Sequence, residues 1–138
     1  MKASFWLRAL ALVLALFTLG HTIGNIPRIT RGEQEASVVA AMQGFRFPIM
    51  GFTRSYWDFY QGFSLTITAL LAVLMLIAWQ AAGIADKSYQ SALPFAVSLL
   101  VACAALGVIS WHYFFAGPVI ASCLAIGCAT AAVISLRS

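Results

Sequence analysis

The chain has 138 residues, of which 62% are hydrophobic and only 9% are charged, and its mean hydropathy is +0.94. Because roughly a quarter of the residues of a soluble domain are charged, this composition excludes a water-soluble globule and leaves room for about four membrane-crossing helices of about 20 residues. The net charge of +4 arises without any run of adjacent basic residues, which argues against nucleic-acid binding and predicts contact with anionic lipid headgroups.

The first predicted element is an apolar helix from about residue 4 to about residue 24. It begins just after Lys2 and contains Arg8, and a charged start before an apolar core is also typical of a secretory signal peptide. The residues that follow the core, 20–23, contain no small-x-small cleavage site. We therefore expect a retained membrane helix.

A more hydrophilic segment, residues 25–54, connects the first helix to the second. Within it, the spacing Thr30-x-x-Glu33 is typical of a capping box and predicts a short helix from about residue 31 to about residue 43. That helix is expected to carry apolar side chains on one face, with polar ones turned away: Val38, Val39 and Met42 against Gln34 and Glu35.

The residues after this short helix, 45–50, are too apolar for a free loop. We therefore expect residues 31–50 to lie in the membrane interface as an amphipathic lid, with their arginines among the lipid phosphates. An ordinary solvated loop is the alternative.

Three further apolar helices are predicted, over about residues 56–80, 91–111 and 118–136. Pro94 falls in the first turn of the middle one, where its missing amide costs nothing. The connection before residue 118 is so short that the last two helices must form a tight antiparallel hairpin. A face for close packing is indicated by small residues at every fourth position: Gly117, Ala121 and Ala125.

These elements predict an all-α fold, namely one integral-membrane four-helix bundle over residues 1–138 with an amphipathic interfacial segment between its first two helices. Four crossings bring the end of helix one, the start of helix two, the end of helix three and the start of helix four to one membrane face. The candidate ligand-binding residues gather there: Tyr56, Trp57, Tyr60, Gln61, Trp111 and Tyr113. The aromatic residues among them also suit an aromatic belt at the membrane surface, which is the structural alternative.

Three ionisable residues are expected on the same face, and we treat His21, Asp58 and His112 as candidate catalytic residues. Ionisable groups inside a membrane are functional by default, and a histidine bonded to a carboxylate can accept a proton from a substrate. The structural alternative is that Asp58 forms a capping box with Ser55 and that each histidine bonds or caps the end of its own helix.

No metal site is predicted. Two histidines and a carboxylate can hold a divalent ion, but no two such ligands stand at ligand spacing on one helix. The sequence also lacks nucleophile motifs, phosphate-binding glycine loops and dinucleotide fingerprints, so no cofactor is identified. The cysteines lie in apolar stretches without a Cys-x-x-Cys pair and are interpreted as small hydrophobic residues: Cys103, Cys123 and Cys128.

Three segments carry a resemblance to a known family: His21-Thr22-Ile23-Gly24, Ser55-Tyr56-Trp57-Asp58-Phe59-Tyr60-Gln61-Gly62-Phe63 and Tyr113-Phe114-Phe115-Ala116-Gly117-Pro118. With them the chain resembles a family of small, uncharacterised bacterial four-helix membrane proteins. The resemblance implies a bacterial cytoplasmic (inner) membrane and a compact bundle similar in size to DoxX-like proteins. It supplies no catalytic residues.

The orientation in the membrane does not follow from charge, because the eight Lys and Arg residues divide equally between the two predicted faces. We expect both termini in the cytoplasm, since translocation of a short charged N-terminus is the less usual arrangement.

Two functions from different classes are consistent with the sequence. The first and preferred one is a binding protein, whose aromatic mouth holds a lipid, a quinone, another apolar small molecule or a partner's helix. Membrane lipids, a second copy of the chain and other membrane proteins are the candidate partners. The second is a membrane-embedded enzyme in which His21 or His112 works with Asp58 in proton transfer on an apolar substrate.

Overall fold

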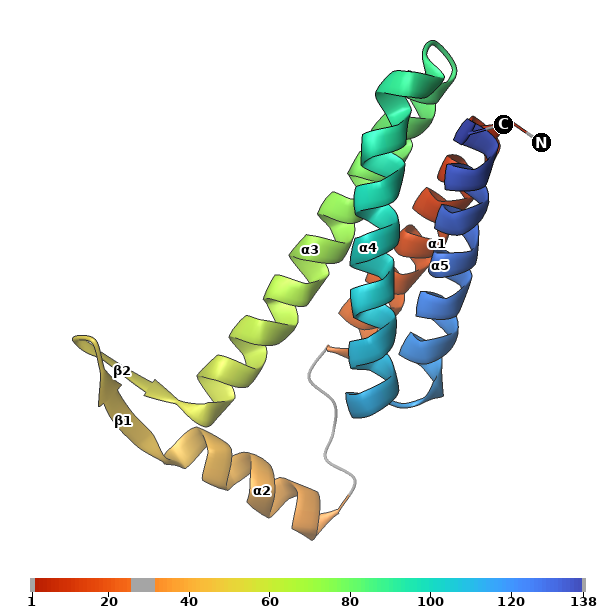
Figure 1. Cartoon of the computed structure of the whole chain (residues 1–138). Coiled ribbons are helices and arrows are strands. Elements are labelled where there is room, and N and C mark those ends of the chain that lie inside the picture. Colours follow the sequence, from red (N-terminus) through yellow and green to blue (C-terminus); the bar gives the residue numbers. More distant parts are fainter. Residues whose placement is uncertain (1, 26–31, 138) are drawn as a thin grey trace. The chain divides into compact units, whose positions relative to one another are not determined.

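A computed structural model describes residues 2–25 and 32–137 of the chain. Figure 1 shows its elements in sequence order: α1 (Ala3–Gly24), α2 (Glu33–Gly44), β1 (Arg46–Ile49), β2 (Phe52–Ser55), α3 (Tyr56–Ala85), α4 (Tyr89–Tyr113) and α5 (Ala116–Arg137). Helices α1, α3, α4 and α5 are long and apolar enough to cross a membrane, with mean hydropathies of 1.8, 2.2, 2.4 and 2.3. The prediction of four long apolar helices, compatible with a membrane helical bundle, is therefore confirmed. A short fifth helix and a two-stranded hairpin accompany them, so the described fold is mostly but not entirely helical.

The chain divides into two compact units. The bundle unit comprises Met1–Gly20 and Leu70–Ser138, and the hairpin unit comprises His21–Ala69. Helix α1 lies mostly in the first unit, and α3 contributes its first half to the hairpin unit and its second half to the bundle unit.

The bundle unit is packed through small side chains. Between apolar helices in hydrocarbon there is little hydrophobic driving force, so association depends on van der Waals contact, which small residues allow at short range. The buried positions are mainly alanine and leucine: Leu7, Leu10 and Leu14 of α1, Ala78, Ala81 and Ala82 of α3, Ala92, Ala96 and Leu99 of α4, and Ala125, Ala129 and Ala132 of α5.

Helices α4 and α5 form the predicted tight hairpin. The Oγ atoms of Ser110 and Ser122 lie 3.3 Å apart and both residues are buried. Further along, a Cβ added to Gly107 would stand 2.9 Å from Cδ1 of Ile126, so the absence of a side chain permits this approach.

The packed stripe of α5 differs from the predicted one. Gly117 is exposed, and Ala121 is only half-buried, whereas Ala125 is buried as expected. The stripe runs from Ser122 in the direction of the C-terminus, at spacings of three and four residues: Ser122, Ala125, Ala129 and Ala132. Positions four residues apart drift around a helix that has 3.6 residues per turn. The predicted four-residue repeat therefore does not follow the buried face of α5.

The link between α3 and α4 is shorter than predicted. Helix α3 continues through Gly83 to Ala85, because Ala81, Ala82 and Ala85 are buried and packing overrides the low helix propensity of the glycine. Helix α4 starts at Tyr89, so Pro94 lies in its second turn and not in its first.

Both ends of this link are held by polar contacts. The Ser88 hydroxyl caps α4 by accepting the amide hydrogen of Ser91 at 3.3 Å. At the end of α3, Asp86 Oδ2 pairs with Arg8 Nη2 at 2.8 Å, which brings the first turns of α1 to the link.

The β-hairpin was not predicted. Strand β1 pairs antiparallel with β2, with Arg46 opposite Ser55 and Ile49 opposite Phe52. The two turn residues, Met50 and Gly51, both have positive φ, of 47° and 84°. Such turns are usually recognised by Asn-Gly or Asp-Gly, and a methionine in the first position gives no such signal.

Helix α2 confirms the predicted short helix but not its amphipathic pattern. Its N-cap is Gly32, with no side-chain capping bond, and Thr30 of the predicted capping box lies outside the described residues. No residue of α2 is buried. Val39 and Met42 are half-buried, whereas Gln34, Glu35 and also Val38 are exposed, so the expected separation of apolar and polar side chains is only partial.

Candidate ligand-binding site

The hairpin is joined to α3 by a capping box. Ser55, the last residue of β2, donates its amide hydrogen to Oδ2 of Asp58 at 2.8 Å. In return, the Asp58 amide donates to Oγ of Ser55 at 3.2 Å, and Ser55 is buried. This exchange satisfies two backbone amides at the helix start. The structural alternative for Asp58 is thus confirmed.

Replacement of Ser55 by alanine should lower the free energy of unfolding by about 1 kcal/mol, because the Asp58 amide then loses its side-chain acceptor. Thermal unfolding in detergent, followed by circular dichroism, measures this effect. The matched variant is Asp58→Asn, whose side-chain oxygen still accepts from the Ser55 amide, and it should lie close to the wild type. Equal stability of Ser55→Ala and the wild type would show that the cap contributes nothing.

Stacked and tilted ring contacts hold the hairpin against α3. The Phe47 ring is the centre of the group, with ring centroids 5.2 Å from Tyr56, 6.0 Å from Phe59 and 6.0 Å from Phe45. The Phe45 ring also stacks on Tyr56, with centroids 5.8 Å apart, and the centroid of the Phe59 ring lies 6.1 Å from that of Phe63. We call these five residues the aromatic cluster. Aromatic pairs of this kind contribute about 0.5–1.5 kcal/mol each beyond their buried area.

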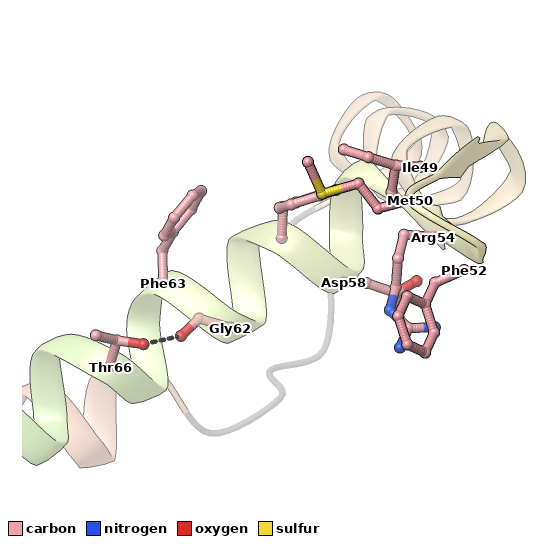
Figure 2. A pocket seen from close by; sticks show the side chains of 9 residues that line it. Ile49, Met50, Phe52, Arg54, Asp58, Gly62, Phe63 and Thr66 are labelled. Atoms are coloured by element: carbon pink, nitrogen blue, oxygen red, sulfur yellow. Dashed lines mark hydrogen bonds between the residues drawn. The ribbon is translucent and has the colours of Figure 1, made fainter.

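An open depression of about 470 Å³, which we call the pocket, lies between the hairpin and the first turns of α3, and all of its lining residues except the half-buried Phe59 are exposed. Figure 2 shows its lining, which comes from both elements: Ile49, Met50, Phe52, Arg54, Asp58, Phe59, Gly62, Phe63 and Thr66. The Thr66 hydroxyl donates to the carbonyl oxygen of Gly62 at 2.8 Å, so its proton is used within the helix. Apart from this hydroxyl and the side chains of Arg54 and Asp58, the pocket walls are apolar.

Arg54 lies at the strand side of the pocket. Its Cζ is 5.1 Å from the centroid of the Phe52 ring, a cation–π geometry. Its Nη1 donates to the carbonyl oxygen of Thr53 at 3.1 Å, and Arg46 Nη2 donates to the same oxygen at 3.2 Å. The hairpin therefore presents two exposed guanidinium groups close together.

The structure does not bring His21 to Asp58. Nδ1 of His21 lies 3.0 Å from Oγ1 of Thr68, whose hydroxyl donates to the carbonyl oxygen of Ser64 at 3.3 Å. Thr68 follows Asp58 by ten residues (58 to 68) on α3, which is about 15 Å along the helix axis.

The third candidate, His112, belongs to the bundle unit. It is exposed near the end of α4, and its ring centroid lies 6.3 Å from that of Tyr113. Within residues 2–25 and 32–137, no three His, Cys, Asp or Glu side chains are grouped to hold a metal ion.

None of the six predicted ligand-binding residues lines the pocket. Tyr56 belongs to the aromatic cluster, Trp57 stacks on Tyr60 with centroids 5.4 Å apart, and Gln61 is half-buried. The other two are exposed at the end of α4 in the bundle unit: Trp111 and Tyr113.

The residues that do line the pocket follow a helical spacing that was available in the sequence. Positions 59, 62, 63 and 66 of α3 are three or four apart and so share a face, whereas Trp57 and Gln61 of the predicted residues occupy another. The hairpin was not predicted, and without it the sequence did not indicate which face of α3 would be covered.

The described helices define the class of the protein by their length and composition, which are those of a helical multi-pass membrane protein. Comparisons of the chain with protein-family models, curated proteins and solved structures give no match. The resemblance to small bacterial four-helix membrane proteins stays a prediction.

Proposed function

We propose that this protein is a multi-pass membrane protein that binds an apolar small molecule or lipid chain in the pocket between the hairpin and α3. The observation that carries the proposal is the pocket itself. Its volume of about 470 Å³ falls in the range of small-molecule sites, roughly 300–1,000 Å³, and its walls are mostly apolar with few polar groups.

The location proposed is the bacterial cytoplasmic membrane, with both termini in the cytoplasm. The ion pair between Arg8 and Asp86 supports a part of this topology, because it brings the start of α1 and the α3–α4 link to the same end of the bundle unit. In an alternating four-helix arrangement these two regions share one membrane face.

An enzymatic function is less well supported. It depends on a histidine that acts together with Asp58, and the Asp58 carboxylate is bonded to the Ser55 amide while His21 is bonded to Thr68. These are structural contacts for both groups. Binding is therefore the function we favour.

The experiment that tests binding is to fill the pocket. Gly62 lines the pocket and has no atom within 4 Å of the position of an added Cβ, so leucine can enter without a clash. Native mass spectrometry of the wild type in mild detergent should show a retained lipid or other apolar molecule. In Gly62→Leu, retention should fall at least about tenfold, the equivalent of about 1.4 kcal/mol of binding free energy.

The matched control is Gly83→Leu, a substitution at an exposed glycine of the same helix that also has no neighbour within 4 Å and lies outside the pocket. It should retain the ligand like the wild type. Both variants gain helix propensity of about 0.5–1 kcal/mol, so loss of folding does not explain a difference between them. Equal retention by Gly62→Leu and the wild type would contradict the proposal.

A further inference from the structure

The two charged side chains of the pocket lie at one end of it. Figure 2 shows Asp58, Arg54 and Phe52 together near the start of α3, whereas Gly62, Phe63 and Thr66 lie further along the helix. Helix α3 starts at this charged end of the pocket and continues as an apolar helix to Ala85. A ligand that follows this pocket thus meets charge at one end and hydrocarbon-like walls at the other.

Both charged groups keep binding capacity. A guanidinium has five N–H donors, and within the described residues the Arg54 side chain uses one of its nitrogens, Nη1, on a carbonyl. For Asp58, Oδ2 accepts from Ser55, and the described part of the chain gives Oδ1 no hydrogen-bond donor. No ion pair within 4.0 Å joins Arg54 to Asp58 in residues 2–25 and 32–137.

We propose, on the basis of the binding function above, that the ligand is a phospholipid whose headgroup carries both a phosphodiester and a primary ammonium, as in phosphatidylethanolamine. The phosphodiester binds Arg54, since a guanidinium matches phosphate oxygens with paired donors. The ammonium binds Oδ1 of Asp58. The acyl chain lies along Phe59 and Phe63.

Other phospholipid headgroups match this pair of charges less well. Phosphatidylglycerol carries the same phosphodiester but no cation, so it leaves the Asp58 carboxylate without a charged partner. Phosphatidylcholine has a cation, but its trimethylammonium has no N–H to donate to Oδ1. The missing charged hydrogen bond should lower the affinity for these lipids roughly tenfold.

The test is lipid binding by native mass spectrometry, with phosphatidylethanolamine, phosphatidylcholine, phosphatidylglycerol and neutral diacylglycerol of identical acyl chains. The wild type should bind phosphatidylethanolamine at least about tenfold more tightly than the other three. Asp58→Asn keeps an acceptor for the Ser55 amide and should reduce phosphatidylethanolamine to the level of phosphatidylcholine. Arg54→Gln should weaken all three phospholipids and leave diacylglycerol unchanged.

The wild-type comparison stands without any variant, so a variant that fails to fold does not remove the test. Equal binding of the four lipids, still lost in Gly62→Leu, would overturn the headgroup assignment and leave the binding function intact. A preference for phosphatidylglycerol would also overturn the headgroup assignment and leave the binding function intact. If none of the four lipids binds the wild type, both the assignment and the lipid-binding function are wrong.

Discussion

Replacement of Ala96 by leucine should destabilise the bundle unit by about 1–3 kcal/mol. Ala96 lies in α4 and has 0% of its surface exposed, so a larger side chain has no space unless helices move apart. Small residues at helix contacts allow the backbones to approach, and van der Waals contact at that short distance is what stabilises apolar helices against one another in a membrane. The measurement is thermal or denaturant unfolding in detergent.

The matched control is Ala105→Leu, which makes the same substitution on the same helix at an exposed position. An exposed site of a transmembrane helix faces lipid or detergent, where leucine is accepted, and a surface substitution changes stability by less than about 0.5 kcal/mol. If both variants unfold at the same temperature, the alanine-lined packing of α4 is not what stabilises the bundle.

Removal of the Phe47 ring should release the hairpin from α3. Phe47→Ala abolishes the three ring contacts with Phe45, Tyr56 and Phe59, and we expect a loss of about 2 kcal/mol in the free energy that closes the hairpin on the helix. Hydrogen exchange of the amides in residues 46–55 should then be about 30-fold faster, because each factor of ten corresponds to about 1.4 kcal/mol. Ligand retention should fall with it, since Ile49, Met50 and Phe52 form one wall of the pocket.

Two control variants distinguish the effect of the ring contacts in the aromatic cluster from the effect of apolar side chains in general. Phe47→Leu keeps an apolar side chain without the ring contacts and should exchange at an intermediate rate. Phe52→Ala removes a 61% exposed ring that lies outside the aromatic cluster, so protection of residues 46–55 should stay close to that of the wild type. Unchanged exchange in Phe47→Ala would show that the rings do not hold the hairpin.

Local patterns in the sequence predicted part of the site correctly. The spacing Ser55-x-x-Asp58 indicated a capping box, and the structure has both of its hydrogen bonds. A capping box depends on residues within one helical turn, so its members are close whatever the rest of the chain does. The same holds for the α4–α5 hairpin, where a two-residue connection leaves no other arrangement.

The structure pairs His21 with Thr68 and not with the predicted Asp58, for the opposite reason. The prediction assumed that two helix ends on one membrane face bring their side chains together, but residues on one face can stand several turns apart in depth. His21 is bonded to Thr68, which lies about 15 Å from Asp58 along the axis of α3. Nothing in the local sequence of either histidine indicated Thr68 as a partner.

Hydropathy alone was sufficient to establish four long apolar helices, because a bilayer requires about 20 consecutive apolar residues and satisfies no backbone group outside a helix or a barrel. The pocket needed the three-dimensional arrangement. It exists because a Met50-Gly51 turn with positive φ folds residues 46–55 back on themselves and because the Phe47 ring stacks on α3. Contacts between segments depend on such turns and on side-chain fit, which no periodicity along a single helix contains.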